Sequence, residues 1–205
     1  KREVETLDSF EVGARGQLGP TRYDVAAYTM KKDNFFFRDS DGLNVPNGKT
    51  DHVGFEAAFD GDLVEAGDGM VKWNANVSWS DQTYAFNRNV VAAGEDIVDG
   101  GRIDTAPEWL GDAGLGWEND TFSLFASLEW VGEYFTNAAN TAKYDGHTIG
   151  HIRGAWRFSD RLEAFAIIRN VSDERYADRA DFAQGQDRYF PGEPANVTLG
   201  VRVRN

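Results

Sequence analysis

Residues 197–204 read VTLGVRVR, a stretch in which apolar and polar side chains alternate without interruption. In an extended chain every second side chain points to the same side, so the two kinds of residue separate onto two faces. One face carries Val197, Leu199, Val201 and Val203, and the other carries Thr198, Gly200, Arg202 and Arg204. This period of two predicts a β-strand whose apolar face contacts either a protein core or lipid.

The same alternation recurs along most of the chain, whereas helical patterns are almost absent. Several alternating segments are longer than the roughly five or six residues that are usual for strands of soluble sheets. The pattern predicts an all-β fold of about nine strands. The expected strands are Leu7–Leu18, Arg22–Phe37, Thr50–Asp60, Met70–Tyr84, Trp109–Glu118, Thr121–Phe135, Thr148–Phe158, Arg161–Val171 and Ala195–Arg204.

Composition excludes several classes of function. The formal net charge of −13 argues against nucleic acid as a partner, because phosphates require a basic surface. The absence of cysteine excludes disulfides and thiolate metal sites. No nucleophile–base pair or phosphate-binding glycine loop stands out, so we expect a protein that is not an enzyme. No apolar run approaches the roughly 18 residues of a membrane helix.

Short and long connections alternate along the chain. Tight turns are expected at Gly19–Thr21, Asn119–Asp120 and Ser159–Asp160, and the connection at 61–69 is intermediate in length. Long polar loops are expected at 38–49, 84–108, 136–147 and 172–194. Such alternation is typical of an antiparallel up-and-down transmembrane β-barrel, which has short periplasmic turns and long extracellular loops. Lipid is therefore the favoured contact of the apolar face, with the C-terminus on the periplasmic side.

Aromatic residues gather near both ends of the predicted strands. Trp117, Phe122 and Phe158 flank short turns, whereas Trp79, Trp130 and Tyr134 lie toward the long loops. Two such girdles fit the two membrane interfaces of a barrel. In an extracellular carbohydrate-binding β-sandwich they would instead fill a core or stack on sugars. A passive porin-type barrel is the other alternative.

The last third of the chain carries a recognisable motif. Asn170-Val171-Ser172-Asp173 is followed by Tyr176, and Pro191-Gly192 precedes the closing amphipathic strand. This pattern resembles the C-terminal end of TonB-dependent outer-membrane transporters, with Asn170, Asp173, Tyr176, Pro191 and Gly192 as the family signature. The stretches NAANTAKYDGHT (137–148) and ADRADFAQGQDRYFPGEP (177–194) look most like the iron-chelate branch, which includes receptors for ferric citrate and siderophores. Two departures are the final Asn205, where the family usually has an aromatic residue, and Ala195, where a basic residue is common.

The resemblance implies a place for this chain in a larger molecule. The family builds a barrel of about 22 strands around an N-terminal plug domain that carries a TonB-engaging segment. Nine strands correspond to the last two-fifths of such a barrel, so residues 1–205 are expected to be the C-terminal part of one transmembrane β-barrel domain. The plug and the earlier barrel strands are then expected to precede Lys1.

The implied function is an outer-membrane receptor for active transport. It would bind and import a scarce substrate, a ferric siderophore or a ferric-citrate-like chelate, with energy supplied through TonB. Its partners would be outer-membrane lipid, the TonB complex acting through the plug, and the anionic ferric chelate. Iron would be chelated cargo, and no cofactor is expected. The protein would lie in the outer membrane of a Gram-negative bacterium.

Arginine and tyrosine residues of the long loops are the candidate substrate contacts. Arginine recognises carboxylates with two parallel hydrogen bonds, and tyrosine supplies a flat surface with a polar tip. The candidates are Arg88, Arg102, Tyr134, Tyr144, Arg175, Arg179, Arg188 and Tyr189. The alternative is that these arginines pair with nearby acids and order the loops. The acids considered are Asp99, Asp104, Asp173, Glu174, Asp178 and Asp187.

His147 and His151 have the spacing of a helical metal pair. On a strand, four residues at about 3.3 Å each place the two side chains on one face but about 13 Å apart, which is too far for one ion. We therefore expect no metal site.

Overall fold

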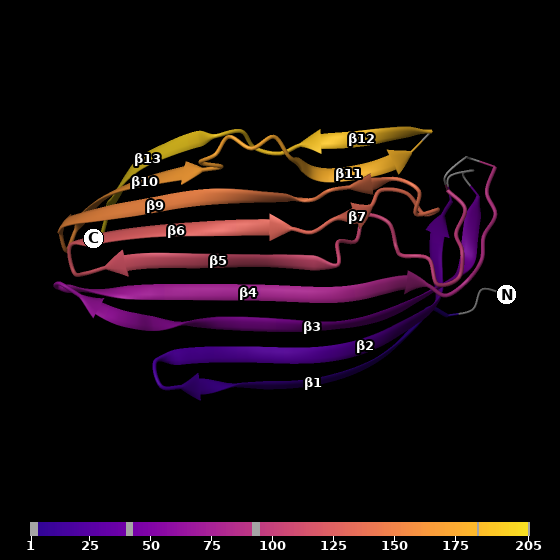
Figure 1. Cartoon of the computed structure of the whole chain (residues 1–205), viewed down its shortest axis with the longest axis horizontal. Coiled ribbons are helices and arrows are strands. Elements are labelled where there is room, and N and C mark those ends of the chain that lie inside the picture. The colour runs from indigo at the N-terminus through magenta and orange to yellow at the C-terminus, as the bar shows by residue number, and fades with distance from the viewer. Residues whose placement is uncertain (1–3, 40–42, 92–94, 184, 205) are drawn as a thin grey trace.

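The computed structural model describes residues 4–39, 43–91, 95–183 and 185–204. Nine of the described strands form one antiparallel sheet, in the order β1-β2-β3-β4-β5-β6-β9-β10-β13 (Figure 1). Neighbours in this sheet follow one another along the chain, and two short hairpins, β7–β8 and β11–β12, are inserted in the loops. The all-β antiparallel fold is confirmed. Among the described residues no helix is long and apolar enough to cross a membrane.

The sheet strands match the nine predicted segments one for one. The bounds are β1 Thr6–Leu18, β2 Thr21–Arg38, β3 Asn44–Ala66, β4 Gly69–Tyr84, β5 Trp109–Glu118, β6 Phe122–Val131, β9 His147–Ser159, β10 Leu162–Arg169 and β13 Asn196–Val203. The inserted strands are β7 Tyr134–Phe135, β8 Lys143–Tyr144, β11 Ala177–Ala183 and β12 Gln186–Pro191.

Two predicted connections are wrong, because β3 is far longer than its apolar pattern. It extends at both ends, so the loop expected at 38–49 shrinks to residues 39–43, and the connection expected at 61–69 shrinks to residues 67–68. Gly67 has a φ of +65°, a left-handed conformation that favours glycine in so tight a turn. Phe135 also lies outside the main sheet, since β6 ends at Val131.

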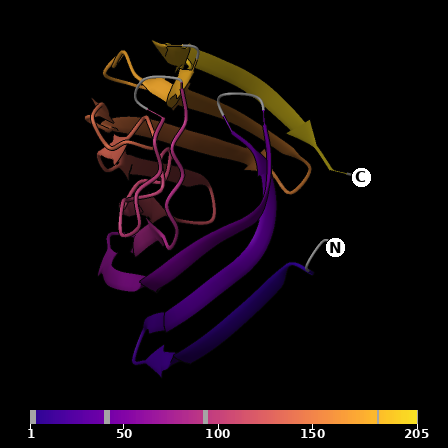
Figure 2. The same ribbon diagram turned by 90° about the vertical axis from the view of Figure 1, so that its right-hand side faces the viewer.

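The two ends of the sheet differ as the sequence predicts. The short turns after β1, β3, β5 and β9 lie at one end, together with the C-terminus (Figure 1). The longer connections, including both inserted hairpins, lie at the other end (Figure 1). We call these the turn end and the loop end. Figure 2 shows that the sheet is curved, with β1 and β13 at its two margins.

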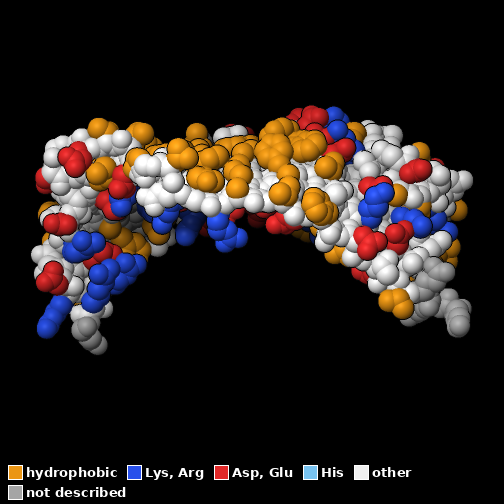
Figure 3. Space-filling model, turned by 90° about the horizontal axis from the view of Figure 1, so that it is seen from below, with side chains coloured by type: hydrophobic (Ala, Val, Ile, Leu, Met, Phe, Trp, Pro, Cys, Tyr) orange, Lys and Arg blue, Asp and Glu red, His pale blue; other side chains and the backbone are white. Residues whose placement is uncertain are grey.

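The two faces of the sheet differ in chemistry. Register brings apolar residues of neighbouring strands into line on one face, as in the row of Leu199, Ala166, Gly154 and Leu124. Val197, Leu199, Val201 and Val203 on this face are 62–76% exposed. Hydrophobic side chains gather on this outer face between the two ends, while the hollowed inner face carries charge (Figure 3). No second sheet packs on it among the described residues, so the sandwich alternative is wrong.

Two aromatic groups bracket the outer face. Toward the loop end Phe55, Trp79 and Trp109 pack together with ring centroids 5.9–6.3 Å apart. Toward the turn end Trp117 packs on Phe122 and Trp156 packs on Phe158. Trp109 and Trp117 lie on one strand, and eight residues at about 3.3 Å each separate them by about 26 Å. That is close to the roughly 25 Å apolar band of outer-membrane barrels.

Buried side chains are concentrated at the loop end. One cluster joins Tyr84, Ile97 and Ala138, and another joins Tyr134, Ala177 and Ala180. Tyr134, expected in an aromatic girdle, instead belongs to this second cluster and is 8% exposed. The loop end therefore has small cores of its own, which hold its connections in place.

Candidate ligand-binding mouth and inner face

The hairpin β11–β12 presents two of the predicted arginines on a shared support. Asp181 has a side chain only 5% exposed, and it accepts a hydrogen bond of 2.7 Å from Nε of Arg188. Nη2 of Arg179 lies 2.5 Å from the other carboxylate oxygen of Asp181. Both guanidinium groups also lie over the ring of Phe190, at 5.6 and 6.0 Å from its centroid. Three charged groups with a net charge of about +1 thus stand together at the loop end.

Two tyrosine hydroxyls dock this hairpin onto the rest of the loop end. The backbone N–H of Ala180 donates to the hydroxyl of Tyr134 at 2.8 Å, and that of Ala177 donates to Tyr144 at 3.1 Å. Burial raises the pKa of Tyr134. The hydroxyl of Tyr144 also lies 2.9 Å from Nδ1 of His147. Tyr134 and Tyr144 therefore hold the hairpin in position, and their contact with substrate stays a prediction.

The loop 85–108 uses its arginines for internal pairing. Arg88 donates from Nε at 3.0 Å to Asp39, whose side chain is 2% exposed. Arg102 pairs with Glu108, and its backbone exchanges two hydrogen bonds with the Asn140 side chain. Pairing with carboxylates is thus observed for four of the five candidate arginines, although the partners are not the acids expected from the sequence.

Arg175 and Tyr189 differ from the other candidates. Both are exposed, Tyr189 by 57%, and neither side chain makes a hydrogen bond or ion pair with the described residues. Their contact with substrate stays a prediction. Asp181 is not among the contacts predicted from the sequence, because a period of two sets it on the face opposite to its apolar neighbours Ala180 and Phe182 and so gives no signal of its burial.

The signature residues join two chain segments beside this hairpin, and Asn170 makes the central hydrogen bonds. Asn170 is 1% exposed, donates to the carbonyls of Glu174 and Glu193 at 2.9 and 3.0 Å, and accepts from the Glu174 N–H. Its φ of +49° is a left-handed conformation that asparagine tolerates well. These bonds join the segment after β10 to the segment before β13.

The remaining signature residues reinforce the same junction. Asp173 accepts a hydrogen bond of 2.9 Å from the N–H of Ala195. The Tyr176 hydroxyl accepts from the N–H of Glu193, and its ring packs on Gly192, where any side chain would clash with it. Pro191 ends β12 opposite Ala177. The signature therefore has a folding role here, which is to fix the last long connection onto the final strand.

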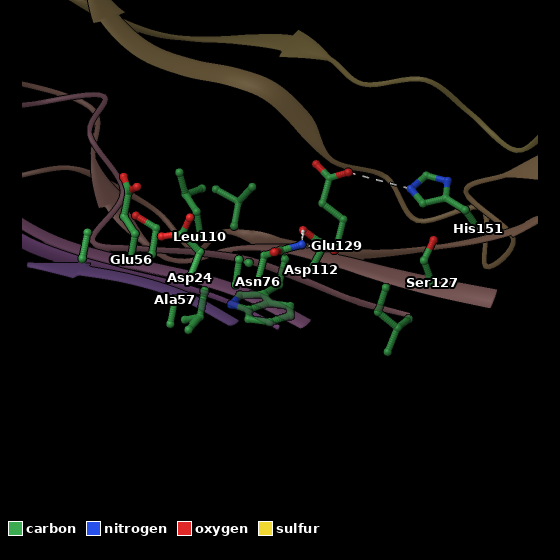
Figure 4. A pocket seen from close by; sticks show the side chains of 17 residues that line it. Asp24, Glu56, Ala57, Asn76, Leu110, Asp112, Ser127, Glu129 and His151 are labelled. Carbon is green, nitrogen blue, oxygen red and sulfur yellow. Dashed lines mark hydrogen bonds and ion pairs between the residues drawn. The ribbon is translucent and has the colours of Figure 1, made fainter. Parts of the chain in front are cut away.

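The inner face carries acidic side chains from neighbouring strands. Asp24, Glu56, Asp112 and Glu129 line one recess of about 690 Å³ and project to the same side of the sheet (Figure 4). Asn76 donates to Asp112 at 2.9 Å, and Glu129 lies 3.9 Å from Nε2 of His151 (Figure 4). His147 lies with its ring 4.4 Å from that of Tyr176. Among the described residues no three His, Cys, Asp or Glu side chains are placed to share a metal ion.

Comparison with known families identifies the class of protein. Residues 3–171 match the family described as TonB dependent receptor-like, beta-barrel. The match covers most of the chain, so the protein belongs to this family, as its signature motif predicts. Asn170 lies inside the matched range, and Asp173, Tyr176, Pro191 and Gly192 lie beyond it. No curated protein matches the sequence.

Solved structures share the fold. The ferric yersiniabactin uptake receptor FyuA from Yersinia pestis aligns with 97% of the chain at 14% identity and a TM-score of 0.78. The ferric citrate transporter FecA in its unliganded form aligns with 96% at 15% identity, and the copper transporter OprC with 99% at 14% identity, both with a TM-score of 0.78. The chain spans only 30–32% of the length of these three proteins. The similarity therefore shows the fold of the nine-stranded sheet, which forms the wall of the barrel.

Proposed function

We propose that this chain is the C-terminal part of the barrel of an outer-membrane active-transport receptor. The complete protein would import an anionic ferric chelate, a siderophore complex or one resembling ferric citrate, with energy from TonB acting through a plug domain. The loop end would face the outside of a Gram-negative cell, and the C-terminus would face the periplasm. Iron would enter as chelated cargo.

Family membership is the observation that carries this proposal. The exposed apolar belt, bracketed by aromatic groups about 26 Å apart, supports a membrane setting. The substrate class is supported by the mouth, where Arg179 and Arg188 share one carboxylate and the Arg175 side chain has no acidic partner among the described residues. The family match favours the receptor over a passive porin-type barrel.

The test is a binding titration with the complete receptor. Ferric citrate and a ferric tricatecholate, both anions, serve as ligands for the unsubstituted protein and for the triple variant Arg175→Ala, Arg179→Ala, Arg188→Ala. Each hydrogen bond to a charged group contributes roughly 1.5–3 kcal/mol, so losing two should weaken binding more than tenfold.

The control variant is Arg161→Ala, which removes an exposed cation at the turn end. Its affinity should equal that of the unsubstituted receptor. If the triple variant binds as tightly as the control, the mouth arginines serve only to order the loops. If neither anion binds the unsubstituted receptor, the proposed substrate class is wrong.

A further inference from the structure

The inner face is divided into an acidic and a basic half. On β2–β6 its charged residues include the carboxylates of the acidic recess described above. On β9, β10 and β13, and at the residue directly after β13, the same face carries five arginines and, among the described residues of these segments, a single carboxylate, Glu163. The arginines are Arg153, Arg157, Arg169, Arg202 and Arg204. The chain as a whole has a net charge of −13, so a strip with five arginines and one carboxylate departs clearly from its average composition.

Three of these arginines surround Glu163, which is 8% exposed. Arg202 donates to it at 2.7 Å, while Arg157 and Arg204 approach it at 3.8 and 3.7 Å. The side chains of the three arginines remain 44–56% exposed. One buried carboxylate therefore leaves about two positive charges of this cluster without compensation, at the turn end of the inner face.

The other two arginines have no acidic partner among the described residues. Arg153 lies with its guanidinium carbon 4.7 Å from the ring centroid of Phe125, a contact that holds the side chain without neutralising it. The side chain of Arg169, at the loop end of β10, makes no hydrogen bond or ion pair with the described residues. Both line a recess of the inner face that also holds the carboxylates of Asp112, Glu129, Asp178 and Glu193, and among the described residues neither guanidinium forms an ion pair with them.

Register places these cations in sequence along the wall. Arg169 lies nearest the loop end. Arg153 comes next, opposite Ile167, and Arg157 and Arg202 lie opposite Glu163 toward the turn end. Six residues of β10 separate Arg169 from Glu163, which is about 20 Å at 3.3 Å per residue. Guanidinium groups thus recur from the loop end to the turn end, at steps of roughly 7–13 Å.

We propose that the inner face of β9, β10 and β13 is a track for anionic cargo. The proposal rests on the proposed transport function and adds the route taken through the barrel. Several spaced cations attract a multivalent carboxylate or catecholate complex at each step, yet none forms an enclosed site that would retain it. The acidic half of the inner face repels the same cargo and confines it to the basic strip.

The experiment separates binding at the mouth from movement along the wall. The double variant Arg153→Gln, Arg169→Gln is made in the complete receptor, and ferric citrate and ferric tricatecholate are used as probes. The dissociation constant is measured by titration, and the initial rate of energised iron uptake is measured in cells. We expect affinity within twofold of the unsubstituted receptor and uptake at least fivefold slower.

Two matched variants make the result specific. Arg153→Lys, Arg169→Lys keeps the charge and should keep uptake within twofold. Arg15→Gln, Arg22→Gln removes two cations from the inner face of β1 and β2 and should also leave uptake within twofold. All variants are compared at equal receptor level in the outer membrane.

Three results would overturn the track. One is unchanged uptake by the glutamine variant although the chelates still bind. Another is an equal decrease of the uptake rate in the lysine and glutamine variants, which would mean that the two arginines act through packing and not through their charge. The third is entry of large antibiotics into cells that carry the glutamine variant, without energy. That result would mean that the two arginines normally hold an acidic segment of the receptor inside the barrel, and that losing them opens the barrel. Absence of any chelate binding by the unsubstituted receptor would contradict the proposed function as well.

Discussion

The sheet and the loop end of this molecule are stabilised in opposite ways. On the sheet, the large apolar side chains face outward, and Leu199 is 76% exposed. At the loop end, side chains such as Tyr134 and Asn170 are buried and make specific hydrogen bonds. The sheet, which forms the wall, thus has no hydrophobic core of its own among the described residues, whereas the loop end, which forms the mouth, has two small ones.

This difference shows which part of the stability is internal. The wall is joined by main-chain ladders, and its apolar face gains its favourable free energy only in a nonaqueous surrounding. The loop end must exclude water by its own packing, so individual side-chain contacts matter there. Substitutions in the two regions should therefore fail for different reasons, and the following four tests use the unfolding free energy of the complete protein in lipid.

The largest effect is expected on the outer face of β13. Val201→Arg places a charge near the middle of the apolar belt and should lower the unfolding free energy by about 2–4 kcal/mol in a bilayer. Urea titration of protein refolded into vesicles measures this loss. Val201→Leu, which keeps the apolar surface, is the control. A cost below about 1 kcal/mol for the arginine variant would show that this face does not meet lipid.

The next largest effect is expected at Asn170, the buried signature residue at the loop end. Asn170→Ala removes three hydrogen bonds from a site that is 1% exposed and should cost about 2–3 kcal/mol. Asn196→Ala, which removes a single bond to the carbonyl of Pro194, is the matched control and should cost under about 1 kcal/mol. Equal costs for the two variants would remove the assigned folding role of Asn170.

A smaller effect is expected where the hairpin β11–β12 docks. Tyr134→Phe leaves the N–H of Ala180 without its acceptor in a fully buried position and should cost about 1–2 kcal/mol. Hydrogen exchange at Ala180 should accelerate accordingly. Tyr189→Phe removes an exposed hydroxyl without a described partner and should change neither quantity. Unchanged exchange in the Tyr134 variant would contradict docking through this hydroxyl.

The smallest effect is expected on the inner face of β13. Arg202→Gln removes one of the three arginines around Glu163, while Arg157 and Arg204 remain near it. The Arg202 side chain is 56% exposed, so its ion pair is screened by water and the cost should be about 0.5–1 kcal/mol, well below that of Val201→Arg one residue away. Similar costs at positions 201 and 202 would erase the distinction between the two faces.

The wall was predictable from the sequence because its two faces meet different surroundings. Alternation marked all nine sheet strands, and β13 and β4 lie where the pattern places them. The pattern failed at residues 44–49 and 61–66 of β3, where the apolar residues Val45, Leu63 and Val64 do not alternate regularly with polar ones, and where Pro46, Gly48 and Gly61 are typical of loops. A strand segment without a period of two has no amphipathic signal to detect.

The candidate site was less predictable, because its contacts join residues that are distant along the chain. Arg88 pairs with Asp39, 49 positions away, rather than with the nearer acid Asp99. The two arginines of the hairpin converge on Asp181 because antiparallel pairing sets Arg188 opposite it. Residue types indicated that cations would gather at the mouth, and only the folded loops determine which cation meets which acid.

The shared support of Arg179 and Arg188 also bears on the entropy of recognition. Immobilising a long side chain on binding costs roughly 0.5–1.5 kcal/mol, because its rotamers must be reduced to one. Asp181 and the ring of Phe190 already restrict both guanidinium groups, so most of this ordering is complete before any ligand arrives. An anion would then meet two donors that are already restricted, whereas Arg175, whose side chain has no partner among the described residues, must still be ordered.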